Sequence, residues 1–118
     1  MADPRVETLR RTHVPYVVVV GTTAGVVASC RYAAAVGASA LVEECSVANV
    51  ATVCATWRPI AIVVPAEIYD FDASEFDALG RDAGGEVVAL PSLELPEDEL
   101  RRWLVDRFRI AAQRRGGV

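Results

Sequence analysis

Three acidic side chains that could coordinate a cation follow a strongly apolar stretch of the chain. Glu67, Asp70 and Asp72 come shortly after residues 60–64 (IAIVV), a run typical of a parallel strand buried on both faces. Open α/β sheets bind ligands beyond the carboxyl ends of their strands, and carboxylate oxygens are the ligands that Mg²⁺ and Ca²⁺ prefer. In the alternative, which we favour, Asp72 caps the next helix and the other two acids lie in a solvated loop. We therefore predict no metal site.

Other residue types that perform chemistry are poorly placed for it. Residues 21–25 (GTTAG) form a turn before a predicted helix, but they match no nucleotide-binding glycine pattern, and the chain contains no lysine. His13, the only histidine, precedes the first predicted strand, at the opposite end of the sheet from the acids. Cys30, Cys45 and Cys54 have no CxxC spacing and sit in apolar segments, as buried thiols in a reducing cytoplasm do. We predict no catalytic residue and no cofactor.

The composition is that of one globular domain with unevenly placed charge. The 118 residues are 53% hydrophobic, and no apolar run reaches the ~18 residues of a membrane span. The first residues (MADPRVETLRRTH) lack the apolar core of a signal peptide, so we expect a cytoplasmic protein with no membrane contact. Residues 66–99 carry eleven acids and one arginine, whereas residues 101–118 carry six arginines and one acid. Because the whole chain has a net charge of −4, we consider nucleic acid only a minor alternative as a partner.

Apolar runs and helix-ending residues divide the chain into alternating strands and helices. Strands are predicted at residues 16–20, 40–45, 60–64 and 86–90, and helices at residues 26–36, 47–57, 73–83 and from Pro96 onward. This alternation predicts an α/β fold with a parallel sheet and helices on both faces. We expect helix caps at Thr22 or Thr23, Ser46, Asp72 and Gly37.

The last predicted helix has one apolar stripe that would cover the sheet. Its members follow each other at spacings of three and four residues, and they are Leu100, Trp103, Leu104, Phe108 and Ala111. The folded domain is expected to span residues 13–113. It would follow a lead-in at residues 1–12 and precede a flexible tail at residues 114–118.

Four stretches together resemble the receiver domain of bacterial response regulators. They are residues 16–21 (YVVVVG), 58–65 (RPIAIVVP), 85–92 (GEVVALPS) and 95–109 (LPEDELRRWLVDRFR). The resemblance covers roughly residues 14–112 and implies a three-layer, flavodoxin-like fold. Only residues 91–94 (PSLE) separate the fourth strand from Pro96, and a further parallel strand needs a crossover of about a dozen residues. The family's fourth helix and fifth strand are therefore missing, which predicts a four-stranded sheet in the order 2-1-3-4.

The resemblance also locates the family's phosphorylation chemistry on this sequence. The acidic pair that holds magnesium falls on Gly21 and Thr22, and the phosphoacceptor aspartate falls on Pro65. The hydroxyl residue after the fourth strand falls on Pro91, one place before Ser92, and the lysine falls on Leu95. Phosphoryl transfer to a carboxylate needs an oxygen nucleophile and a cation held by oxygens. We therefore expect a degenerate pseudo-receiver that is not phosphorylated on aspartate.

The remaining surface favours binding to a protein. Residues 47–57 predict a helix without a charged residue, and residues 86–90 would be an apolar edge strand. The candidate interaction residues are Val87, Val88, Trp103 and Phe108, against the alternative that the two aromatic side chains complete the core. We expect a non-catalytic signalling module of a two-component system that binds a protein partner or forms a homodimer. The alternative is a small-ligand sensor, for phosphate or a nucleotide, or a small enzyme, using the pocket at the carboxyl ends of the strands.

Overall fold

The computed structural model describes residues 14–91 and 95–116 and has the predicted α/β architecture. Its sheet is parallel, with the strand order β2-β1-β3-β4. The strands are β1 (Tyr16–Val20), β2 (Leu41–Cys45), β3 (Ala61–Pro65) and β4 (Glu86–Leu90). The helices are α2 (Ala24–Ala38), η1 (Val47–Asn49, a 3₁₀ turn), α3 (Val50–Trp57), α4 (Ala66–Phe71), α5 (Ala73–Ala83) and α6 (Glu97–Gly116). The predicted fold class and strand order are confirmed.

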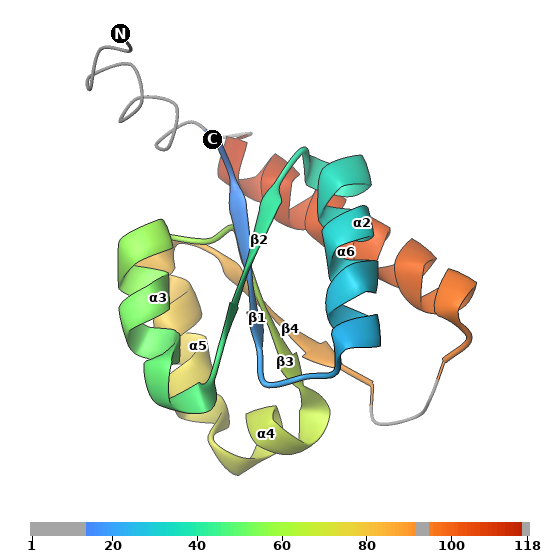
Figure 1. Ribbon diagram of the computed structural model, residues 1–118. Helices are drawn as coiled ribbons and strands as arrows, with labels where there is room; N and C mark the ends of the chain where they lie inside the picture. The colour runs from blue at the N-terminus through green and yellow to red at the C-terminus, as the bar shows by residue number, and fades with distance from the viewer. Residues whose placement is uncertain (1–13, 92–94, 117–118) are drawn as a thin grey trace, which may run out of the picture.

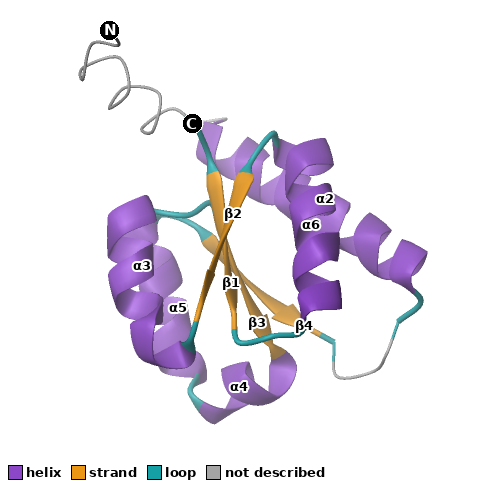
Figure 2. Ribbon diagram, in the orientation of Figure 1, coloured by secondary structure: helices purple, strands orange, loops and turns teal. Residues whose placement is uncertain are grey.

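The helices form one layer on each face of the sheet. Helices α2 and α6 cover one face and α3 and α5 cover the other, while α4 lies at the end where the strands finish (Figures 1 and 2). Strand β1 is buried along its whole length, because it lies inside the sheet and under both layers. Its alternating side chains supply two cores, with Val17 and Val19 on the α2–α6 side and Val18 and Val20 on the other.

Helix α2 is longer at both ends than its apolar pattern predicted. Thr23 caps its start, since the Thr23 hydroxyl accepts a hydrogen bond from the Val26 N–H at 3.3 Å. The predicted end at Gly37 is wrong, because the helix continues to Ala38 and Ser39 takes the left-handed capping conformation with φ of 51°. Gly37 has a packing role instead. A Cβ at this position would lie 2.6 Å from the Val105 carbonyl oxygen of α6, so only glycine allows this approach of the two helices.

Two other predicted caps do not form through their side chains. Neither Ser46, before η1, nor Asp72, before α5, makes a side-chain capping hydrogen bond. The first turn of α5 is held by a backbone hydrogen bond, in which the Phe76 N–H donates to the Asp72 carbonyl at 3.2 Å. The residues before Asp72 were expected to form a solvated loop, but they fold into the short helix α4.

Helix α6 has the predicted buried stripe and extends further than expected. Leu104, Phe108 and Ala111 are buried, and Leu100 and Trp103 pack partly buried against the same core. The helix runs to Gly116, so it includes residues 114–116, which were expected to lie in the tail. Arg114 forms an ion pair with Glu86, and Arg115 donates to the Arg58 carbonyl at 2.7 Å. The lead-in at residues 1–12, His13 and residues 117–118 lie outside the described residues.

Candidate functional site

The carboxyl ends of the strands bring together most of the residues that the receiver resemblance singled out. Gly21 follows β1, Pro65 ends β3 and Pro91 follows β4, and the register places Pro65 beside Leu90. Thr22 is half-buried next to Gly21, and Leu95 is half-buried just before α6. Ser92 lies outside the described residues. None of these five described residues carries a carboxylate, the side chain that Mg²⁺ and Ca²⁺ prefer as a ligand.

Helix α4 closes this end of the sheet. It begins directly after Pro65, whose φ of −56° suits the residue before a helix. Ile68 and Tyr69 pack against the α3–α5 core. A Cβ at Gly21 would lie 3.5 Å from Ile68 Cδ1, so an apolar side chain contacts the position that the resemblance aligns with a magnesium-binding acid. A weak signal for this helix is present in the sequence, since Pro65 before it and Glu67 in its first turn are typical of a helix start.

Gly21 is also constrained by its backbone. Its φ is +46°, a conformation that side chains with a Cβ rarely adopt, and its N–H donates to the Cys45 carbonyl at 3.0 Å. The turn between β1 and α2 therefore favours glycine, and a carboxylate-bearing residue there would strain the backbone.

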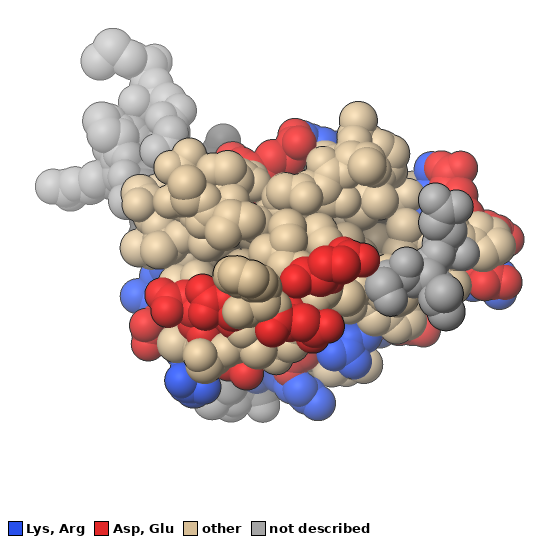
Figure 3. Space-filling model, turned by 90° about the horizontal axis from the view of Figure 1, so that it is seen from below, with Lys and Arg blue, Asp and Glu red and all other residues tan. Residues whose placement is uncertain are grey.

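The acidic residues near this end are exposed to solvent. Figure 3 views this end of the molecule and shows acidic side chains across the middle of the face, with basic ones mostly near its outline. Glu67, Asp70 and Asp72 are exposed, and within residues 14–91 and 95–116 no group of three or more His, Cys, Asp or Glu side chains could hold a metal ion. Asp77 has a structural role, because it accepts a hydrogen bond of 2.9 Å from the Tyr69 hydroxyl. This bond is the main reason that the pKa of Tyr69 is raised.

The three cysteines are free thiols in apolar surroundings. Burial raises the pKa of Cys30 to about 12. Burial, with a smaller contribution from Cys45, raises the pKa of Cys54 to about 11. The pKa of the half-buried Cys45 is raised by burial as well. A thiolate is the reactive form of cysteine, so these side chains are poor nucleophiles at neutral pH.

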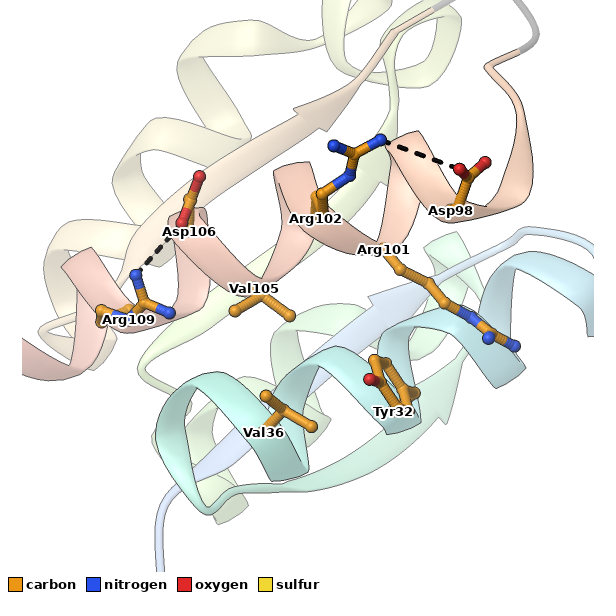
Figure 4. Close-up of a pocket in the computed structure, with 8 residues that line it drawn as sticks. All are labelled: Tyr32, Val36, Asp98, Arg101, Arg102, Val105, Asp106 and Arg109. Carbon is orange, nitrogen blue, oxygen red and sulfur yellow. Dashed lines mark hydrogen bonds and ion pairs between the residues drawn. The ribbon is translucent and has the colours of Figure 1, made fainter.

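A shallow groove of about 530 Å³ lies between α2 and α6 on the outer surface (Figure 4). Tyr32 and Val36 of α2 and Val105 of α6 supply its apolar lining. The arginines around it already have partners. Arg102 pairs with Asp98 at 3.7 Å and Arg109 pairs with Asp106 at 3.2 Å.

The third arginine of the groove is held in two ways. Arg101 pairs with Glu97 at 2.6 Å, and its guanidinium carbon lies 5.0 Å from the centre of the Tyr32 ring. Because each of these arginines is paired with an acid of the same helix, the groove has little unpaired positive charge to bind an anionic ligand.

The residues predicted for an interaction surface fall into two groups. Val88 and Phe108 are 1% and 0% exposed, so their assignment to a surface is wrong and they belong to the core. Val88 packs into the α2–α6 core, on the face of β4 opposite to Val87, and Phe108 lies on the buried stripe of α6. Val87 and Trp103 are half-buried, and both pack against the core while keeping some exposure.

Other apolar side chains are more exposed than these. They are Tyr32, Val36, Leu41, Val47 and, at 94% exposure, Phe71. Helix α3 shows the uncharged outer face that the sequence indicated, with Ala51, Thr52, Ala55 and Thr56 exposed. Phe71 was not singled out, since a six-residue helix is too short to show a periodic pattern.

Comparisons with protein-family models, curated proteins and solved structures find no match for this chain. The similarity to receiver domains therefore stays a prediction that rests on the residues quoted above. In the part of the chain that the structure describes, none of the helices combines the length and apolar character needed to cross a membrane.

Proposed function

We propose that this chain is a non-catalytic, receiver-like regulatory module that acts by binding a protein surface and is not phosphorylated on aspartate. The observation that carries this proposal is the position of Ile68, whose Cδ1 would lie 3.5 Å from a Cβ at Gly21. In a working receiver that region would hold a cation between carboxylates, whereas here it holds a branched aliphatic side chain from α4.

Two further features support the same function. Pro65 stands at the end of β3, where the resemblance places the phosphoacceptor, and it has neither a nucleophilic group nor an N–H. The uncharged outer face of α3 and the exposed apolar side chains on α2 and α4 offer surface that a protein partner can cover. We infer that the module works in the cytoplasm of a bacterium, alongside two-component signalling proteins.

The alternative of a small-ligand sensor or small enzyme has less support. Ile68 and Tyr69 of α4 pack against the α3–α5 core, and Thr23 already caps the first turn of α2. An anion that approached the start of α2 would therefore find the Val26 N–H already hydrogen-bonded to Thr23 and the apolar side chain of Ile68 nearby.

Acetyl phosphate tests the non-catalytic proposal directly. The chain is incubated with acetyl phosphate and Mg²⁺, and its intact mass is compared with that of an active receiver domain treated in parallel. We expect the receiver to gain a phosphoryl group and this chain to keep its mass. A phosphoryl group on this chain that hydroxylamine removes, as it removes acyl phosphates, would refute the proposal.

A further inference from the structure

Strand β4 has backbone hydrogen-bonding groups that point away from the sheet. The Glu86 N–H donates to the Ile60 carbonyl at 2.9 Å, and β4 then pairs with β3 along its whole length. In a parallel strand the N–H and C=O of one residue point to the same side, and successive residues alternate. Val87 and Ala89 therefore direct their N–H and C=O groups outward, and the described residues provide no backbone partner for them.

Helix α6 adds a half-buried flank beside this edge. Arg114 contacts Glu86, the first residue of β4, and helical spacing places Ile110, Arg107 and Trp103 on the same side of α6 as Arg114. These three side chains are all half-buried. The Arg107 Nε is buried without a hydrogen-bond partner among the described residues. The side of α6 that carries Arg114 is thus only partly covered.

The opposite edge of the sheet differs in its charges. Strand β2 is bonded to β1 through Leu41 and Cys45, because the Leu41 N–H donates to Pro15 and the Cys45 carbonyl accepts from Gly21. Its outward groups belong to Val42 and Glu44, which lie symmetrically around Glu43. Antiparallel pairing of β2 with a second β2 would place the Glu43 side chains opposite each other. Like charges in that position oppose pairing, which is a common protection of edge strands.

We propose that β4 pairs in antiparallel orientation with β4 of a second copy of this chain, with Val88 on the two-fold axis. In that register Val87 opposes Ala89 of the other copy, and each such pair exchanges two N–H···O=C bonds. No charged residue lies between Val87 and Leu90, so no repulsion arises at the centre. The two four-stranded sheets join into one continuous sheet. This inference rests on the proposed function, because it names a second copy as a partner of the binding module.

A pair of proline variants tests which edge forms the dimer. At Ala89 the N–H that proline removes points away from β3, so the ladder within the monomer is kept. Glu44→Pro is the matched control on the other edge, and it also removes the exposed ion pair of Glu44 with Arg31, which contributes little. Sedimentation equilibrium of the full chain gives the dissociation constant of the dimer. We expect Ala89→Pro to raise it at least about tenfold and Glu44→Pro to leave it within about twofold.

Three results would overturn the inference. They are a wild-type chain that stays monomeric at high micromolar concentration, a dimer that Ala89→Pro leaves intact, and a dimer that Glu44→Pro dissociates as strongly as Ala89→Pro. None of them depends on phosphorylation. If the chain is a monomer that acetyl phosphate does not modify, the dimer is refuted and the non-catalytic role stands. If the chain is a dimer that acetyl phosphate modifies, the dimer stands and the non-catalytic role is refuted.

Amide hydrogen exchange provides a test that needs no variant, which matters if Ala89→Pro fails to fold. Exchange at Val87 and Ala89 is measured by NMR at low and high protein concentration, with Val42 and Glu44 as the control pair. We expect the Val87 and Ala89 amides to exchange at least about fivefold more slowly in the concentrated sample, because dimer formation hydrogen-bonds them. Equal exchange at both concentrations would contradict the proposed pairing.

Discussion

Gly37 of α2 and the carbonyl of Val105 in α6 lie so close that a Cβ on Gly37 would be 2.6 Å from the carbonyl oxygen. This contact joins the two helices that cover one face of the sheet (Figure 1). The Val105 carbonyl oxygen belongs to the backbone and cannot rotate away from a Cβ at residue 37. The close approach of the helices therefore depends on the absence of a side chain at this residue.

Replacing Gly37 by alanine is therefore expected to destabilise the fold, although alanine is the better helix former. The free energy of unfolding should fall by about 1–3 kcal/mol, the usual cost of overpacking. Urea denaturation followed by circular dichroism gives this value. Gly25→Ala is the control in the same helix, because a Cβ there meets no atom within 4 Å and should leave stability unchanged or raise it. Similar losses in both variants would contradict the packing role of Gly37.

The contact of Ile68 with the carboxyl end of the sheet predicts a second stability change. Ile68→Ala removes apolar atoms that pack against the α3–α5 core. It should lower the free energy of unfolding by about 1–2 kcal/mol, less than for a fully buried isoleucine. Phe71→Ala in the same helix is the control, since Phe71 is 94% exposed and its loss should change stability by less than about 0.5 kcal/mol. If Ile68→Ala has no more effect than Phe71→Ala, α4 does not seal this end.

The two residues expected to cap α2 and η1 give a contrast in capping. Thr23 accepts a hydrogen bond from Val26 N–H, whereas Ser46 makes no side-chain capping bond. Thr23→Ala should therefore lower the free energy of unfolding by about 1 kcal/mol, and Ser46→Ala should lower it by less than about 0.5 kcal/mol. Thermal unfolding of both variants in one buffer compares them. A larger loss for Ser46→Ala would show that the capping roles are assigned to the wrong residue.

The buried thiols predict how stability depends on alkaline pH. Folding raises the pKa of Cys30 from 9.0 to about 12 and the pKa of Cys54 to about 11. Above pH 9 the unfolded chain loses protons that the folded chain keeps, so the thiol contribution to stability is present below pH 9 and falls as the pH rises through 11 and 12.

The double variant Cys30→Ala, Cys54→Ala isolates this effect. Its free energy of unfolding should decline less steeply between pH 9 and 11 than that of the wild type, measured by urea denaturation at each pH. Tyr69 also has a raised pKa, but both proteins keep it, so its contribution cancels in the comparison. Parallel declines in the two proteins would show that the thiols do not contribute.

The sheet could be predicted from the sequence because its strands are short β-branched runs bounded by turn residues. The predicted range of β4 is the observed one, and β3 is shifted by only one residue, to Pro65. The carboxyl-end positions could be located for the same reason, since parallel strands place their ends at one edge of the sheet.

The parts that could not be predicted depend on contacts between distant segments. Gly37 has the spacing of a helix end, and only its contact with Val105 explains why the helix continues past it. Likewise, Val88 and Phe108 looked like candidates for a surface. Which side chain of an edge strand or an amphipathic helix faces inward is decided by the layer that covers it, and here that layer buries both.

In the function proposed for this chain, the carboxyl end of the sheet, where Ile68 lies next to Gly21, does not hold magnesium. Titration of the ¹⁵N-labelled chain with Mg²⁺, followed by two-dimensional NMR, tests it most directly through the amides of Gly21, Thr22 and Ala66. We predict small shifts that rise linearly with salt and do not saturate. Saturable shifts at these three amides, reversed by a chelator, would contradict the claim.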